Sequence, residues 1–270
     1  MSNRAMTDHE TGHAEVNGTR LYYEIAGRGQ PLVLIHGFGL DNRLWDEQFR
    51  DYSRRFRVLR YDLRGFGQSQ VPGEQAYRHA DDLCALLDYF EMPQAVLMGL
   101  SLGGWIALNF ALEYPHRVSA LVLVDAILNG QVMSPEWEAE VAPIWREARS
   151  LGVEATKERW HHLAMFAAAR AHPQAGPRLA QIIADWTGWQ FVNRNPETTG
   201  ADAAERLSEI QAPTLVIIGE RDLADFKAMA DRLLAIPLAR KVVIPGAGHL
   251  PPIEAPTLLD ALVLGFLESM

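Results

Sequence analysis

The stretch 95–107, Ala-Val-Leu-Met-Gly-Leu-Ser-Leu-Gly-Gly-Trp-Ile-Ala, constrains the fold of this chain most strongly. Its apolar beginning predicts a buried strand, and the apolar residues after its glycines are spaced as in a helix. Between them, Gly99-Leu100-Ser101-Leu102-Gly103 fits the pattern G-x-S-x-G, a sharp turn from strand to helix with the serine at its tip. We expect strained backbone at Ser101, and glycines where neighbouring backbone passes too close for a Cβ. The hydroxyl would stand at a helix N-terminus, whose free N–H groups favour a developing negative charge.

The rest of the chain predicts an α/β fold with a doubly wound, mostly parallel sheet. Apolar strands are expected at 31–36, 56–61, 120–124, 213–218 and 241–244, and helices alternate with them. Asn17-Gly18 between two alternating segments predicts an antiparallel N-terminal hairpin. We expect residues 1–12 to be a disordered lead-in and residues 13–127 and 211–270 to form the core. Residues 128–210 contain no good strand but several tryptophan-rich helical runs, which predicts a helical cap inserted over the strand ends.

Composition narrows the possible partners. The 270 residues carry a net charge of −9 without a block of like charges, which argues against nucleic acid or an anionic membrane surface. The single cysteine, Cys84, excludes an internal disulfide and suits a reducing compartment. No signal peptide or membrane-spanning run is evident, so we expect a cytoplasmic protein that acts on a small molecule. Composition leaves the oligomeric state open.

Ser101 needs a base to remove its proton and an acid to orient that base. The best base is His249, in a loop just beyond an expected parallel strand, where catalytic groups of open α/β sheets gather. Two aspartates follow other strand ends, Asp222 after 213–218 and Asp125 after 120–124. The order serine, acid, histidine fits either of them, and Asp222 is favoured by position.

Two backbone N–H groups are candidates for stabilising an oxyanion. One belongs to Leu102, directly after the serine, and the other to Phe38, in the glycine-rich His36-Gly37-Phe38-Gly39 segment. We expect the His36 ring to order this segment and not to act as a base. No metal or other cofactor is expected, because the chain has no H-E-x-x-H pattern and no Cys/His cluster.

An apolar substrate pocket is expected beside the serine, and most of the aromatic side chains are expected to pack the cap onto the sheet. The candidate lining residues are Gly37, Trp105, Trp137, Trp160, Trp186 and Leu250.

From about Val16 to its end, the chain resembles the α/β-hydrolase family. The matching segments, in family order, are His36–Gly39, 61–69, Gly99–Gly103, Gly219-Glu220-Arg221-Asp222 and Gly248-His249. The resemblance implies a Ser101–Asp222–His249 triad, structural roles for Asp62 and Arg64, and a cap over the active site.

Within that family, the chain is most similar to serine carboxylesterases and 3-oxoadipate enol-lactonases. Dehalogenases and epoxide hydrolases have an aspartate where Ser101 stands. The expected function is hydrolysis of small carboxylic esters through an acyl-enzyme, with lactone hydrolysis as the alternative. No cationic clamp stands at a motif position, which disfavours a dicarboxylate-like lactone acid, although Arg146, Arg159 or Arg194 of the cap could supply one. An alternative of another class is a ligand-sensing protein with negligible turnover.

Overall fold

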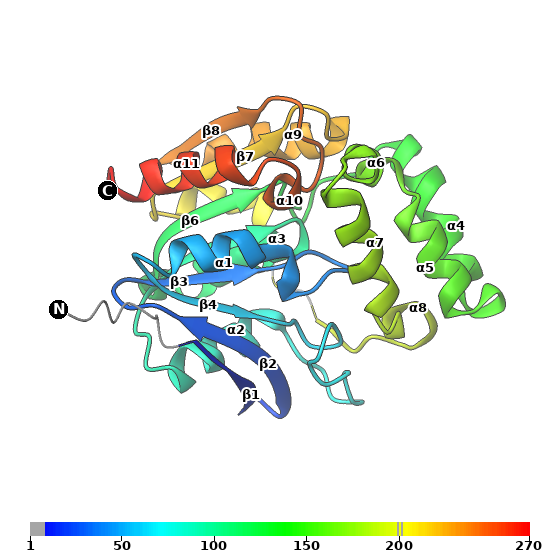
Figure 1. Ribbon diagram of the computed structural model, residues 1–270, viewed down its shortest axis with the longest axis horizontal. Helices are drawn as coiled ribbons and strands as arrows, with labels where there is room; N and C mark the ends of the chain where they lie inside the picture. Colours follow the sequence, from blue (N-terminus) through cyan, green and yellow to red (C-terminus); the bar gives the residue numbers. More distant parts are fainter. Residues whose placement is uncertain (1–8, 199, 201) are drawn as a thin grey trace.

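The structure, a computed structural model, describes residues 9–198, 200 and 202–270. Its eight-stranded sheet has the order β1-β2-β4-β3-β5-β6-β7-β8 (Figure 1). Only the β1–β2 and β2–β4 pairs are antiparallel. The predicted sheet with its antiparallel N-terminal hairpin is therefore confirmed. The strands are β1 (Glu10–Val16), β2 (Thr19–Ala26), β3 (Pro31–Ile35), β4 (Arg57–Tyr61), β5 (Ala95–Leu100), β6 (Val118–Val124), β7 (Thr214–Gly219) and β8 (Ala239–Ile244).

The hairpin forms where the sequence predicts it. Asn17 and Gly18 have φ angles of 46° and 69° and form the two-residue turn between β1 and β2. The predicted lead-in is wrong in its last residues, because β1 begins at Glu10, which pairs with Ile25. Residues 1–8 of that predicted segment lie outside the described residues.

Helices cover the sheet in the manner of a doubly wound fold. Helices α1 and α11 contact each other and lie in front of the sheet in Figure 1, and α2 contacts α3. Every residue of β5 and β7 is buried, as expected for parallel strands covered on both faces. The helices outside the β6–β7 connection are η1 (Asn42–Trp45), α1 (Asp46–Tyr52), α2 (His79–Tyr89), α3 (Leu102–Glu113), η2 (Pro115–Arg117), α9 (Ala224–Arg232), η6 (Leu233–Ala235), α10 (Pro251–Glu254) and α11 (Pro256–Leu267).

Between β6 and β7 the described residues form helices and turns, with one isolated bridge between Tyr77 and Glu197. Figure 1 shows helices α4 to α8 beside one end of the sheet. The division into a core and a cap at residues 128–210 stays a prediction. The elements of this segment are α4 (Pro135–Leu151), α5 (Val153–His161), η3 (Ala164–Phe166), α6 (Ala167–Ala171), α7 (Ala175–Asp185), α8 (Trp189–Val192), η4 (Ala203–Glu205) and η5 (Leu207–Glu209).

A buried lysine joins two of these helices. Lys157 on α5 donates hydrogen bonds to the carbonyl oxygens of Ala184 (2.8 Å) and Trp186 (3.0 Å) at the C-terminal end of α7. These carbonyls have no partner within the helix, and the negative end of the helix dipole favours a cation there. Within the described parts of the chain, no helix combines the length and apolar character needed to cross a bilayer.

Candidate active site

The turn from β5 to α3 has the strained geometry that its sequence predicts. Ser101 has φ 53° and ψ −114° and is the N-cap residue of α3. A Cβ on Gly99 would overlap the carbonyl oxygen of Gly103, and a Cβ on Gly103 would overlap that of Ile35. The two glycines are therefore required by the close approach of backbone, and the expected strain at the serine is confirmed.

The end of β6 and the segment that follows it both bind the backbone of this turn. The Ser101 N–H donates to the carbonyl of Val124 (3.0 Å), and the Ile127 N–H donates to the carbonyl of Ser101 (3.1 Å). The Ser101 carbonyl also accepts the N–H of Trp105 (3.1 Å), so the bond from Ile127 adds to the first hydrogen bond of α3. The position of the hydroxyl is thus fixed by two neighbouring strands.

His249 and Asp222 meet at the same edge of the sheet. His249 Nδ1 lies 2.9 Å from Asp222 Oδ2, and both side chains are buried. The other carboxylate oxygen of Asp222 accepts the N–H of Leu223 at 2.7 Å. A carboxylate in this position favours the histidine tautomer with the proton on Nδ1, which leaves Nε2 free to accept a proton.

A residue that sequence reasoning missed fixes the loop of His249. Glu254 on α10 accepts the N–H groups of Gly248 and of Leu250, the two neighbours of His249, the latter at 3.0 Å. The Phe226 ring lies against the imidazole, with the ring centroids 4.3 Å apart. The only sequence signal for Glu254 is an acid shortly after the Pro251-Pro252 pair, which does not reveal its partners.

Ser101 and His249 line the same cavity, and no hydrogen bond joins their side chains in the described part of the chain. Hydrogen bonds between catalytic groups are often long or absent without substrate and tighten when it binds. The structure therefore brings the three residues of the predicted triad, Ser101, Asp222 and His249, to one place. The transfer of a proton between Ser101 and His249 belongs to the proposal below.

The His36 ring orders the segment that carries Phe38. Its Nδ1–H donates to the carbonyl of Gly37 (2.8 Å), and its Nε2 accepts the N–H of Leu63 (2.9 Å). Burial of the ring lowers the pKa of His36 to about 4, so the imidazole is neutral. The structural role predicted for His36 is confirmed.

The backbone N–H groups of Phe38 and Leu102 are the predicted oxyanion donors. Both residues line the cavity with Ser101, and Leu102 begins α3, so its N–H has no partner within that helix. Within the described residues, neither N–H donates to another loop or side-chain group. Their role as oxyanion donors stays a prediction.

The cavity at Ser101 is apolar and has a volume of about 270 Å³. Three of the predicted lining residues, Gly37, Trp137 and Trp160, line it. Trp145 lines it too and is 41% exposed, so this tryptophan lies at the cavity mouth. The remaining lining residues are Phe38, Leu40, Leu100, Ser101, Leu102, Ile127, Val141, Met165, Phe166, Phe226 and His249.

A family model for the α/β hydrolase fold matches residues 30–256. The chain belongs to the α/β-hydrolase family. It is 30% identical over 251 residues to the pimeloyl-[acyl-carrier protein] methyl ester esterase of Aliivibrio salmonicida (strain LFI1238), which covers 86% of this chain and 90% of that one. It also resembles the enol-lactonase from Burkholderia xenovorans LB400, with a TM-score of 0.82, 28% identity and coverage of 95% and 100%. A thermophilic esterase from Thermogutta terrifontis has a TM-score of 0.77 and 30% identity, with coverage of 96% and 98%.

Three side chains of this α/β-hydrolase lie outside the cavity that they were predicted to line. Trp105 of α3 lines a separate small cavity with His79. The Trp186 ring stacks on Phe66 at 5.9 Å and packs edge-on against Phe38 at 5.2 Å, and the side chain of Leu250 is fully buried. The spacing of these residues predicts that they pack against other apolar side chains, but it does not show which of them face the cavity at Ser101.

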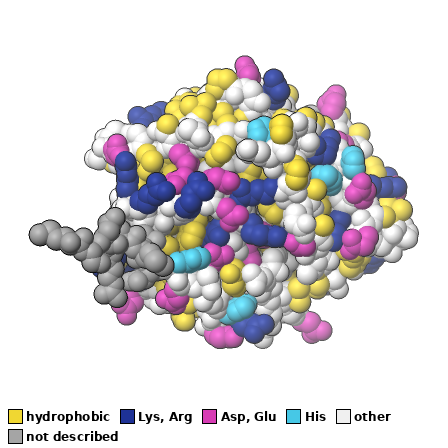
Figure 2. Space-filling view, in the orientation of Figure 1, with side chains coloured by type: hydrophobic (Ala, Val, Ile, Leu, Met, Phe, Trp, Pro, Cys, Tyr) yellow, Lys and Arg dark blue, Asp and Glu magenta, His cyan; other side chains and the backbone are white. Residues whose placement is uncertain are grey.

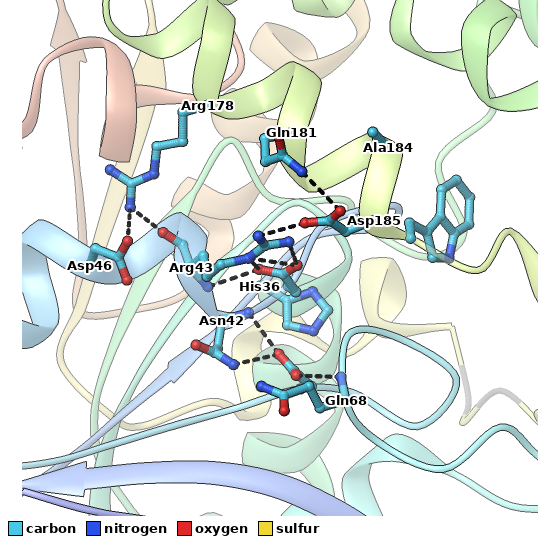
Figure 3. Close-up of polar contacts among 12 residues, drawn as sticks. His36, Asn42, Arg43, Asp46, Gln68, Arg178, Gln181, Ala184 and Asp185 are labelled. Atoms are coloured by element: carbon cyan, nitrogen blue, oxygen red, sulfur yellow. Dashed lines mark hydrogen bonds and ion pairs between the residues drawn. The ribbon is translucent and has the colours of Figure 1, made fainter.

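The loop after β4 has the structural roles that the α/β-hydrolase resemblance implies. Asp62 accepts hydrogen bonds from Asn42 N (2.8 Å), Asn42 Nδ2 (2.7 Å) and Gln68 N (2.8 Å), and Figure 3 labels Asn42 and Gln68, the two donor residues. Burial raises the pKa of Asp62 to about 7. Arg64 forms a buried ion pair with Asp82 at 2.6 Å. Both residues hold the loop that supports His36.

Proposed function

We propose that this α/β-hydrolase is a serine hydrolase of small, neutral, apolar carboxylic esters. The observation that supports the proposal best is the shared cavity of Ser101 and His249, with Asp222 bound to the far side of the imidazole. Such an arrangement supplies a nucleophile, a base and an orienting acid beside an apolar binding space.

In the proposed mechanism, His249 takes the proton of Ser101 as the hydroxyl oxygen attacks the ester carbonyl. The N–H groups of Phe38 and Leu102 stabilise the oxyanion, and one such donor is typically worth about 3 kcal/mol. His249 then protonates the leaving alkoxide, and a water activated by the same imidazole hydrolyses the acyl-enzyme. Asp222 holds the tautomer and stabilises the imidazolium.

The cavity favours uncharged substrates. No lysine or arginine lines it among the described residues, and an unpaired carboxylate would be costly to bury there. Arg146 and Arg159, two candidates for a clamp, both pair with Glu147. The third candidate, Arg194, lines a separate cavity. An apolar cavity of about 150 Å³ in another protein holds benzene, so 270 Å³ suits a medium-length acyl chain or an aryl group.

Lactone hydrolysis is the second candidate. The enol-lactonase from Burkholderia xenovorans LB400 supports it through its TM-score of 0.82. Among the described residues no lysine or arginine lines the cavity, which favours neutral esters over an anionic lactone acid. Esterases among the relatives support the same order of preference.

A substrate panel with a nucleophile variant tests the proposal. We expect turnover of p-nitrophenyl butyrate, weaker turnover of a p-nitrophenyl ester whose acyl chain ends in a carboxylate, and loss of at least about 10³-fold in kcat for Ser101→Ala. Ser150→Ala, in which an exposed serine of α4 is changed, is the matched control and should keep wild-type rates. Preference for lactones over esters would favour the second candidate. Equal rates for Ser101→Ala and wild type would exclude both and favour a ligand-sensing protein.

A further inference from the structure

A second aspartate lies beside the proposed triad acid. Asp125 directly follows β6, as Asp222 follows the neighbouring strand β7, and its side chain is fully buried. Its φ of 44° is in the left-handed region, and its N–H donates to the carbonyl of Ile217 at 2.9 Å. A buried aspartate kept in strained backbone suggests a specific role.

The two oxygens of Asp125 have different surroundings. Oδ1 accepts the N–H of Gly219 at 2.9 Å. Oδ2 is buried and has no hydrogen-bond donor among the described residues. An oxygen of Asp125, an oxygen of Asp222 and a ring nitrogen of His249 all lie within 4.8 Å of one another. As a carboxylate, Asp125 would therefore leave a buried charged oxygen without a partner, next to a second negative charge.

Two buried carboxylates this close cannot both be ionised at neutral pH, so one of them holds a proton. Asp222 faces two groups that can donate a hydrogen bond, His249 and the N–H of Leu223. Asp125 has one such partner, and burial, followed by the nearby charge of Asp222, raises its pKa well above the ordinary range. Glu254 adds to the negative charge around Asp125, and His249 is the nearby group that becomes cationic.

We propose that Asp125 is a positioning residue, a neutral carboxylic acid that donates its proton to Asp222 in a hydrogen bond and so orients the carboxylate that faces His249. The inference rests on the proposed function, in which Asp222 is the triad acid. A proton on Oδ2 gives that oxygen the partner that it otherwise lacks and gives Asp222 a further hydrogen bond. If Asp222 is made neutral, the same Asp125 carboxyl can ionise and stabilise the imidazolium.

The first test compares two substitutions of Asp125. Asparagine keeps a donor toward Asp222 and an acceptor for Gly219, whereas alanine keeps neither. Rates are expressed per site labelled by a fluorophosphonate, so misfolded protein does not count. We expect Asp125→Asn to keep at least about a third of kcat, and Asp125→Ala to lose about tenfold in kcat with KM within about twofold. Equal losses in both variants, or no loss in either, would overturn the proposal.

The second test uses the neutral form of the triad acid. Asp222→Asn should retain a residual kcat that rises with pH as Asp125 ionises. In the Asp222→Asn protein, the further substitution Asp125→Asn should lower this residual kcat at least about tenfold and remove its rise with pH. The same residual rate and pH profile in the single and double variants would contradict the inference.

A spectroscopic measurement does not depend on turnover. The infrared difference between wild type and Asp125→Asn at neutral pH should contain the carbonyl stretch of a protonated carboxylic acid, and its absence would overturn the proposal. Fluorophosphonate labelling of Ser101 distinguishes a failure of the proposed function from a failure of the role proposed for Asp125. If Ser101 is not labelled, the proposed function fails. If it is labelled and the Asp125 variants behave alike, only this inference fails.

Discussion

Buried polar side chains position the active-site backbone, and each has a specific partner. His36 orders the segment of Phe38 through two hydrogen bonds, and Glu254 holds the two N–H groups that flank His249. Removing one partner of such a buried group typically costs about 1–3 kcal/mol. These residues stabilise the fold and the geometry of the site at the same time.

The neutral ring of His36 predicts a dependence of stability on pH. Its folded-state pKa of about 4 lies below the ordinary histidine value of about 6.5, so between these values the unfolded chain binds more protons. The stability contribution is complete above about pH 6.5 and is lost as the pH falls toward 4. Between pH 7 and pH 5, His36 accounts for a loss of about 2 kcal/mol in the free energy of unfolding.

Chemical denaturation of wild type and His36→Asn at both pH values measures this contribution. The difference between pH 7 and pH 5 should be smaller in the variant by about 2 kcal/mol. Burial also lowers the pKa of His79, to about 3. Because His79 is present in both proteins, its contribution to the pH dependence cancels in the comparison. An unchanged difference would show that His36 is not buried as a neutral ring.

At the residue scale, prediction from sequence worked where a residue is tied to its neighbours along the chain. The strain at Ser101 and the need for Gly99 and Gly103 follow from a local pattern. The roles of Asp125 and Glu254 depend on partners from other elements, so no local pattern reveals them. Spacing therefore predicted the turn at Ser101 and placed Asp125 at a strand end, but it did not reveal Glu254 or the partners of either carboxyl group.

At the element scale, the clearest feature is the ionic contact between α7 and the segment of η1 and α1. Figure 3 shows Arg178 and Asp185 of α7 facing Asp46 and Arg43. Arg43 pairs with Asp185 at 2.8 Å, and Arg178 pairs with Asp46 at 3.1 Å and also with Glu47. These pairs hold a helix of the predicted cap to the element that follows the Phe38 segment.

Loss of the Arg178 pairs should loosen this contact. We expect Arg178→Ala to lower the free energy of unfolding by about 1 kcal/mol, because partly exposed ion pairs are weak individually. KM for p-nitrophenyl butyrate should rise more than kcat falls, because the cap supplies cavity walls while the proposed reacting groups lie on the core. Arg50→Ala is the matched control, since Arg50 on α1 pairs with its neighbour Asp51. Equal changes in both variants would contradict a role for α7 docking.

Strands were easier to predict than the docking of helices. The apolar runs that begin at Ala95 and Pro213 predict strands close to β5 and β7, because strands buried on both faces need such runs. Helical periodicity in the 128–210 segment predicts helices, but docking depends on side chains that meet only in the folded chain. For this reason the position of Trp186 was not predictable from spacing, and neither Trp186 nor Trp105 of α3 lines the cavity at Ser101.

At the scale of the whole molecule, the sheet order brings distant segments together. Strands β5, β6 and β7 are neighbours, so the residues after their ends, Ser101, Asp125 and Asp222, meet at one edge. On the face shown in Figure 2, basic and acidic side chains are interspersed across the middle of the molecule. A net charge of −9 without a block of like charges fits the expectation of a small neutral substrate.

The central claim is that Ser101 is the residue that becomes acylated. Reaction with a fluorophosphonate, followed by intact-mass spectrometry and peptide mapping, tests it most directly. The account predicts one adduct per chain, located on Ser101, and loss of esterase activity in proportion to labelling. An adduct on another residue, or full activity in protein labelled at Ser101, would contradict it.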